Sequence, residues 1–212
     1  MFYLVLGSGH QKFESCSGQD KAEACSKVKD EMADRVFILD RSGSMETCLD
    51  DTIGGFNAFL RDQVVDGGTL TLIQFDHEYS LIYDKKPIGE VEPLNRETFK
   101  PRGSTALLDA IGKTVKSITD DRKPTIAILT DGLENASHMY TKSHVKDLVE
   151  QKTKEGWTFV YLGANQDAFA EAGSIGIAPS CTMNYDQRRT PDAFAALSQA
   201  MSSQASGNNI QF

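Results

Sequence analysis

The chain has 212 residues, of which 40% are hydrophobic and 25% charged, so its composition is that of an ordinary globular domain with enough chain to bury a core. The formal net charge of −8 argues against nucleic acid as a partner, because no cluster of Lys and Arg offsets it, and it favours a cationic ligand or partner. No stretch approaches the roughly 20 apolar residues of a membrane span, so no membrane partner is expected.

The cysteines and the first residues bear on the compartment. The four cysteines (Cys16, Cys25, Cys48 and Cys181) show neither C-x-x-C spacing nor a disulfide-dense pattern, which favours reduced thiols, with a Cys16–Cys25 bridge left open as an alternative. Residues 1–6 lack the basic region and the length of a signal peptide. We therefore expect a cytoplasmic protein.

Residues 1–33 precede the regular part of the sequence. Short apolar runs at 2–6 and 12–16 could form two strands joined by a turn, and apolar residues recur at helical spacing over 19–33. We expect a strand or hairpin plus a helix, packed on or beside the main domain, although a role in partner binding is left open. At the other end, residues 207–212 are expected to form a loose tail.

Strands and helices alternate between residues 34 and 206. We expect strands at 35–39, 70–75, 79–83, 125–129, 158–162 and 181–184, and helices at 53–64, 105–118, 143–156, 167–172 and from 190 onward. The strand at 79–83 turns back on the one before it as a hairpin partner, and 84–104 is a long irregular connection. The fold class is therefore α/β: a doubly wound, mainly parallel central sheet with one antiparallel edge strand and helices on both faces. Its ligand site should lie beyond the carboxyl ends of the strands.

A polar turn lies at that edge. The apolar strand at 35–39 ends in Asp40-Arg41-Ser42-Gly43-Ser44, and a helical pattern follows. Alternation in an extended turn lets the oxygen atoms of Asp40, Ser42 and Ser44 converge on one point. Hard oxygen ligands at one point suit Mg²⁺ or Mn²⁺.

Two other polar stretches should reach the same edge. Thr105 lies within Gly103-Ser104-Thr105-Ala106-Leu107, at the start of a helix, and Asp131 follows a buried strand within Thr130-Asp131-Gly132. Together with the Asp40 turn, these stretches resemble the metal-ion-dependent adhesion site of von Willebrand factor A domains. The resemblance covers about residues 34–206 and extends to all five ligand positions; it is closest to stand-alone prokaryotic or phage-encoded members.

The resemblance implies a Rossmann-like fold and a role for each residue. Ser42, Ser44 and Thr105 would be direct or near-direct ligands of Mg²⁺ or Mn²⁺, while Asp40 and Asp131 would supply the only two negative charges, one or both through water. Because two carboxylates only balance a divalent ion, the ion would remain electrophilic and seek an Asp or Glu of a protein partner.

Other residues near the motifs have weaker claims. Glu134 and Asn135 could contact waters of the site, although a solvated loop is the simpler interpretation. Met45 should pack beneath the site. The histidines His77, His138 and His144 lack metal-ligand spacing on a helix, which favours surface or capping roles.

The leading hypothesis is thus a metal-dependent protein-binding module without catalytic activity. Two alternatives are kept: a Mg²⁺-dependent phosphate hydrolase, since a metal at this edge also suits phosphate chemistry, and a structural protein that self-assembles through residues 1–33. Against the hydrolase, the sequence has no Gly-rich phosphate loop with Lys, and position 42 is Ser rather than a second carboxylate.

Overall fold

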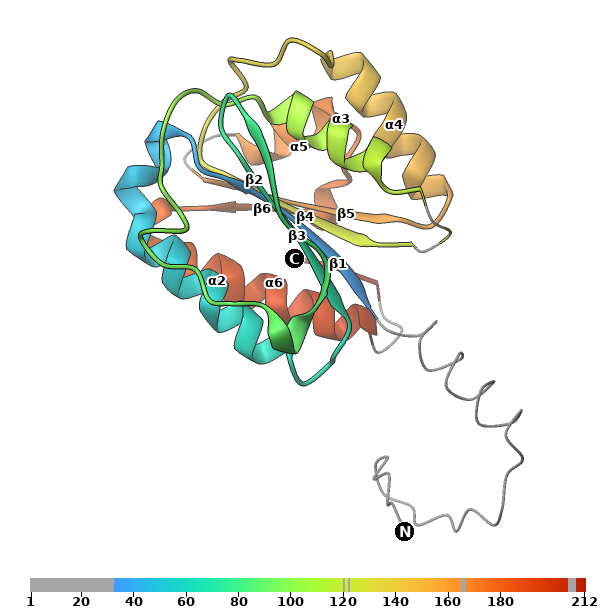
Figure 1. Cartoon of the computed structure of the whole chain (residues 1–212). Helices are drawn as coiled ribbons and strands as arrows, with labels where there is room; N and C mark the ends of the chain where they lie inside the picture. The colour runs from blue at the N-terminus through green and yellow to red at the C-terminus, as the bar shows by residue number, and fades with distance from the viewer. Residues whose placement is uncertain (1–32, 120, 122, 165–166, 206–208) are drawn as a thin grey trace, which may run out of the picture. The chain divides into compact units, whose positions relative to one another are not determined.

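The protein is described from a computed structural model that covers residues 33–119, 121, 123–164, 167–205 and 209–212 (Figure 1). The hairpin, helix and Cys16–Cys25 bridge considered for the N-terminal extension lie outside the described residues. Within the described residues, no helix is both long enough and apolar enough to cross a lipid bilayer.

The described residues form one six-stranded sheet in the order β3-β2-β1-β4-β5-β6. Its strands are β1 (Asp34–Asp40), β2 (Thr69–Phe75), β3 (Tyr79–Pro87), β4 (Thr125–Thr130), β5 (Thr158–Ala164) and β6 (Thr182–Tyr185). The helices are α2 (Leu49–Gln63), α3 (Leu107–Ser117), α4 (Lys142–Lys154), α5 (Ala168–Ser174) and α6 (Thr190–Ala205). Short 3-10 helices are η1 (Gly43–Cys48), η2 (Ile88–Glu90), η3 (Pro179–Cys181) and η4 (Gln187–Arg189).

The strand order places the first strand at the centre of the sheet. β1 pairs in parallel with β2 on one side and with β4 on the other, and only the edge strand β3 is antiparallel to its neighbour among the described strands. This is a doubly wound sheet, as predicted, with its topological switch point between β1 and β4. Ligands of such sheets bind at the switch point, beyond the carboxyl ends of the strands.

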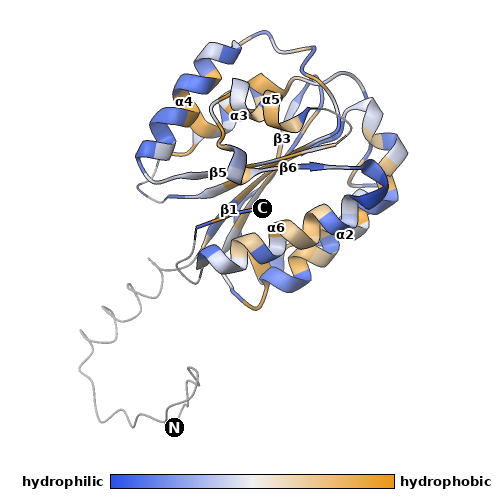
Figure 2. Cartoon of the chain, turned by 180° about the vertical axis from the view of Figure 1, so that it is seen from behind, coloured by the Kyte–Doolittle hydropathy of each residue, from blue (hydrophilic) through white to orange (hydrophobic). Residues whose placement is uncertain are grey.

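Two apolar cores cover the two faces of the sheet. On one face, α2 and α6 pack side by side (Figure 1). In the core beneath them, the rings of Phe56, Phe59 and Phe194 surround Phe37 of β1 at centroid distances of 5.5–5.8 Å. On the other face lie α3, α4 and α5. The outer helix α4 is largely hydrophilic (Figure 2). The central strand β1 is buried along its whole length, as its apolar run predicts.

The structure differs from the sequence prediction at a few element ends. α2 ends at Gln63, one residue before the predicted end of the helix, and Val64 is 47% exposed. The buried position at the helix end belongs to Gln63 instead, which pairs with Arg35 of β1 at 2.7 Å between its Oε1 and the arginine Nε. At the tail, Ile210 is buried in the core on the α2–α6 face.

Candidate metal centre

The five predicted residues lie on three segments at the carboxyl edge of the sheet. Asp40 ends β1, Ser42 and Ser44 follow it at the start of η1, Thr105 precedes α3, and Asp131 directly follows β4. Because β1 and β4 are neighbours, Asp40 and Asp131 emerge on either side of the switch point.

Asp40 is the innermost group of the site. Its side chain is buried, and it accepts a hydrogen bond at each oxygen: Oδ1 from the Ser42 amide at 2.6 Å and Oδ2 from the Thr130 hydroxyl at 2.6 Å. Burial raises the pKa of Asp40 to about 6, although these two hydrogen bonds act to lower it. The carboxylate is thus held in one orientation in surroundings that disfavour its charge.

The three hydroxyl groups face one point. Ser42 Oγ and Ser44 Oγ lie 3.1 Å apart, and Ser44 donates a hydrogen bond to Asp131 Oδ1 at 2.6 Å. A β-carbon placed on Gly132 would lie 2.9 Å from Thr105 Oγ1, 3.5 Å from Ser44 Oγ and 3.7 Å from Ser42 Oγ. The missing side chain of Gly132 therefore leaves space among all three hydroxyls.

The loop after Asp131 holds Thr105 in place. The Thr105 amide donates to Asn135 Oδ1 at 2.9 Å, and the Thr105 carbonyl accepts from the amides of Asn135 and Ala136. Glu134 caps the start of α3, where its Oε2 accepts from the Leu108 amide at 2.9 Å. The interpretation of Glu134 and Asn135 as a merely solvated loop is therefore incomplete, since both position the threonine segment.

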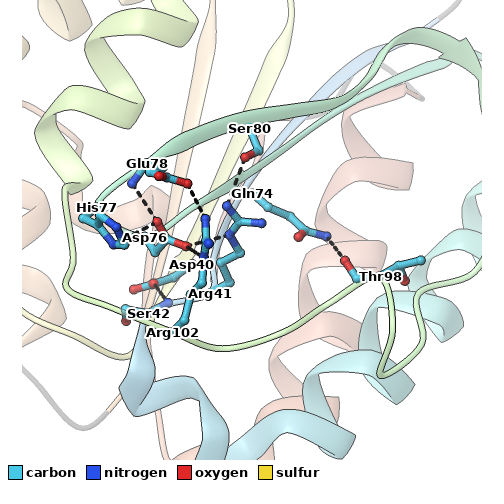
Figure 3. A network of polar contacts seen from close by, with 10 residues as sticks. All are labelled: Asp40, Arg41, Ser42, Gln74, Asp76, His77, Glu78, Ser80, Thr98 and Arg102. Carbon is cyan, nitrogen blue, oxygen red and sulfur yellow. Dashed lines mark hydrogen bonds and ion pairs between the residues drawn. The ribbon is translucent and has the colours of Figure 1, made fainter.

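A second network ties the other two segments together (Figure 3). Asp76, buried at the end of β2, accepts from Arg41 Nε at 2.9 Å and from Arg102 Nε at 2.8 Å. The backbone joins the same segments, because the Arg102 amide donates to the Arg41 carbonyl and the Gly43 amide to the Gly103 carbonyl. The Asp40 turn and the segment that leads to Thr105 are thus held against each other by both side-chain and backbone contacts.

The same network includes a second group of acidic and imidazole side chains, Asp76, His77 and Glu78. Burial acts to raise the pKa of Asp76, but the Glu78 amide and the guanidinium groups of Arg102 and Arg41 outweigh it and lower the pKa. Arg102 also pairs with Glu78. Two guanidinium groups already neutralise this cluster and would repel a metal cation, so it suits a structural role.

The residues of the first site fit a divalent cation. All five side chains offer oxygen, which hard cations such as Mg²⁺ and Mn²⁺ prefer. Burial raises the pKa of Asp131 as well as that of Asp40, so the surroundings of both carboxylates disfavour their charged forms. A cation bound nearby would stabilise those charged forms. That these residues bind a metal stays a prediction, although the structure brings them together.

Sequence reasoning missed one contact of this site. The side-chain amide of Gln187, in η4, donates a hydrogen bond to Asp131 Oδ2. Nothing in the local sequence around Gln187 indicates this contact, because its partner lies 56 residues earlier in the chain. Met45, by contrast, is predicted from the sequence as a packing residue, and it is buried in the core on the α2–α6 face.

The sheet order, the two helical layers and the position of the polar edge define the fold of a von Willebrand factor A domain. The sequence matches no protein-family model and no curated protein. Among solved structures, the von Willebrand factor domain of the type V pili tip protein Mfa5 from Porphyromonas gingivalis is similar with a TM-score of 0.65 and 13% identity, over 85% of this chain and 97% of that one.

Two further similar structures hold metal ions. Proximal thread matrix protein 1 from the mussel byssus, with a zinc-occupied MIDAS motif, has a TM-score of 0.58 and 14% identity over 81% of this chain and 48% of that one. Manganese-loaded TRAP from Plasmodium vivax has a TM-score of 0.55 and 14% identity, over 77% of this chain and 72% of that one. This chain thus spans about half the length of the mussel protein.

Proposed function

We propose that this chain is a metal-dependent protein-binding module that grips an Asp or Glu side chain of a protein partner through a bound Mg²⁺ or Mn²⁺ ion. Asp40, Ser42, Ser44, Thr105 and Asp131 would hold the ion. The observation that carries the proposal is the convergence of three hydroxyls and a carboxylate around the space beside Gly132.

The charge of the site explains why it would seek a carboxylate. Asp40 and Asp131 together carry two negative charges, which balance a divalent ion, whereas a Ca²⁺ cage commonly uses more carboxylates. The hydroxyls add no charge and donate weakly. The ion therefore stays electrophilic, and an incoming carboxylate meets no excess of negative charge.

The site is also open to a partner. Asp40, Ser42 and Thr105 are buried, but Ser44 and the neighbouring Gly43, Gly103 and Ser104 are exposed. An external side chain can thus approach from the Ser44 side, while the buried groups hold the ion from below. A charge-assisted bond formed in such a partly dry place is worth more than one in open water.

The similar structures support a binding role rather than catalysis. Their names include a pili tip protein, a pilus adhesin and a thread matrix protein; the thread matrix protein carries zinc, and a fourth similar structure, TRAP, carries manganese. They support a divalent metal in general; Mg²⁺ in particular, and a cytoplasmic setting for this chain, are proposals that rest on its own sequence.

The test begins with capture of partners from a lysate in Mg²⁺, with and without chelator. Once a partner has been captured, Thr105→Ala should weaken its binding by about 2–5 kcal/mol, or roughly 30-fold to several thousandfold. The reason is that the substitution removes one ligand of the ion to which the partner's carboxylate binds. Thr153→Ala is the matched control, since the Thr153 hydroxyl donates to the Val149 carbonyl of its own helix. Melting temperature should change little in either variant.

A double-mutant cycle then locates the contact. One acidic residue of the partner should be as critical as Thr105, and mutation of both should cost no more than mutation of one. Binding that is indifferent to chelator, or losses that add fully, would mean that the partner docks elsewhere on the chain.

A further inference from the structure

Each carboxylate oxygen of Asp131 accepts a hydrogen bond, one from a predicted metal ligand and the other from Gln187. Asp131 Oδ1 accepts from the Ser44 hydroxyl at 2.6 Å, and Oδ2 accepts from the Gln187 side-chain amide. Gln187 comes from the connection between β6 and α6, so a fourth segment reaches the site in addition to the three that the sequence predicts.

The backbone of Gln187 is held firmly. On one side, the Asp186 carboxylate accepts from the Arg188 amide at 2.9 Å and caps η4. On the other, the buried hydroxyl of Thr190 donates to the Gln187 carbonyl at 2.6 Å. η4 also lies in contact with η1, the short helix that carries Ser44. Gln187 is therefore presented to Asp131 by a preorganised turn rather than by a free loop.

The direction of the Ser44 hydrogen bond matters for a cation. A hydroxyl that donates its proton to a carboxylate turns its lone pairs elsewhere, where they are available to a metal ion. If the Asp131 carboxylate rotated away, the Ser44 proton would be free to point into the space beside Gly132 and would oppose a cation there. The amide of Gln187 resists this rotation, because it binds the second carboxylate oxygen.

The chemistry of glutamine suits this role. A lysine at position 187 would neutralise Asp131 and repel the cation, and a glutamate would repel Asp131. The neutral amide donates a hydrogen bond and adds no charge, so the balance of two carboxylates against one divalent ion is preserved.

We propose that Gln187 is a positioning residue of the metal centre, which orients Asp131 so that Ser44 donates to it and offers its lone pairs to the ion. This inference rests on the proposed function, since it assumes that the hydroxyls hold a cation. It adds a residue outside the five predicted ligands and makes η4, the short turn before α6, part of the site.

The experiment measures Mn²⁺ binding to the full chain by calorimetry, with Gln187→Met, which keeps the length of the side chain and removes the donor. A hydrogen bond to a charged group is commonly worth a factor of about ten or more, so Gln187→Met should weaken Mn²⁺ binding about tenfold. Gln151→Met is the matched control, because Gln151 donates in the same way to Glu155 Oε1 at 2.8 Å on the exposed end of α4. Neither substitution should shift the melting temperature of the metal-free chain by more than a few degrees.

A cycle with Ser44→Ala separates positioning from a general structural effect. If Gln187 acts through the Ser44 hydroxyl, Gln187→Met should cost less than about twofold once that hydroxyl is absent, whereas independent effects would multiply. Full multiplication of the two losses, or unchanged Mn²⁺ binding in Gln187→Met beside a wild-type chain that binds, would overturn the inference alone. Failure of the wild-type chain to bind Mn²⁺ would overturn the inference and the proposed function together.

Discussion

Gly132→Ala is the most direct test of the space among the hydroxyls. The added methyl carbon would lie 2.9 Å from Thr105 Oγ1, where ordinary contact begins at 3.4 Å, so Thr105 must move by about 0.5 Å. The same methyl would stand at ordinary contact distance from Ser44 Oγ. Gly132 is not among the residues with a positive φ, so the backbone itself accepts alanine without strain.

The expected loss of Mg²⁺ affinity in Gly132→Ala follows from the coordination geometry of the ion. Mg²⁺ requires near-ideal octahedral geometry with oxygens at about 2.0–2.1 Å, so a displacement of about 0.5 Å amounts to the loss of a ligand. Even substitutions beyond the ligands themselves commonly cost about 10–100-fold in metal affinity, and we expect at least that for Mg²⁺ here. The free energy of unfolding of the metal-free chain should fall by less than about 2 kcal/mol, since the cost of overpacking is offset in part by the lower entropy of the unfolded chain.

The assay is calorimetric titration of Mg²⁺ into the wild type and the variant, with thermal melting of both metal-free chains. Gly54→Ala is the matched control: an added β-carbon there meets nothing within 4 Å, so metal affinity should not change and the helix should gain about 0.5–1 kcal/mol. Mg²⁺ binding by Gly132→Ala at wild-type affinity would refute the assignment of the hydroxyls as ligands.

Two further predictions concern the frame that carries the site. Gly55→Ala should lower the free energy of unfolding, measured by urea denaturation, by about 1–3 kcal/mol. The added β-carbon would lie 2.3 Å from the Phe194 ring and force α6 away from α2. Stability equal to that of Gly54→Ala would contradict this packing. The Asp109 carboxylate accepts hydrogen bonds from the backbone amides of His138, Met139 and Tyr140. Burial acts to raise the pKa of Asp109, but these hydrogen bonds outweigh it and lower the pKa. The stabilisation by the charged carboxylate is therefore present above pH ~4 and is lost as the pH falls through the folded pKa. Asp109→Asn should therefore cost about 1–3 kcal/mol at pH 7 and progressively less in acid, and a cost that did not shrink on acidification would show that the charge is not involved.

The sequence by itself determined the elements and the polar edge. Continuous apolar runs such as 35–39 are typical of strands buried on both faces, and their alternation with helical patterns predicts a doubly wound sheet. Asp40 and Asp131 each follow such a run, and the carboxyl ends of parallel strands meet at one edge. The convergence of the five predicted residues therefore follows from local pattern together with one topological rule.

Only the tertiary structure decided how these groups are oriented. The donation from Ser44 to Asp131 spans 87 residues, and the support of Thr105 by Asn135 spans 30. Neither leaves a periodic signal, because the hydrogen-bond partner of a polar side chain depends on which segments pack together rather than on its neighbours in the chain.

Gln187 and Gly132 show the same limit most clearly. Gln187 reaches Asp131 because α6 packs on α2 and so brings η4 against η1, an arrangement set by the apolar core on that face of the sheet. Gly132 appears in the sequence as a turn residue, and only its distance to Thr105 Oγ1 shows that its missing side chain leaves space among the hydroxyls. Local pattern thus determined that the five predicted residues reach the edge of the sheet, while long-range packing brought Gln187 to them and decided which of their atoms face one another.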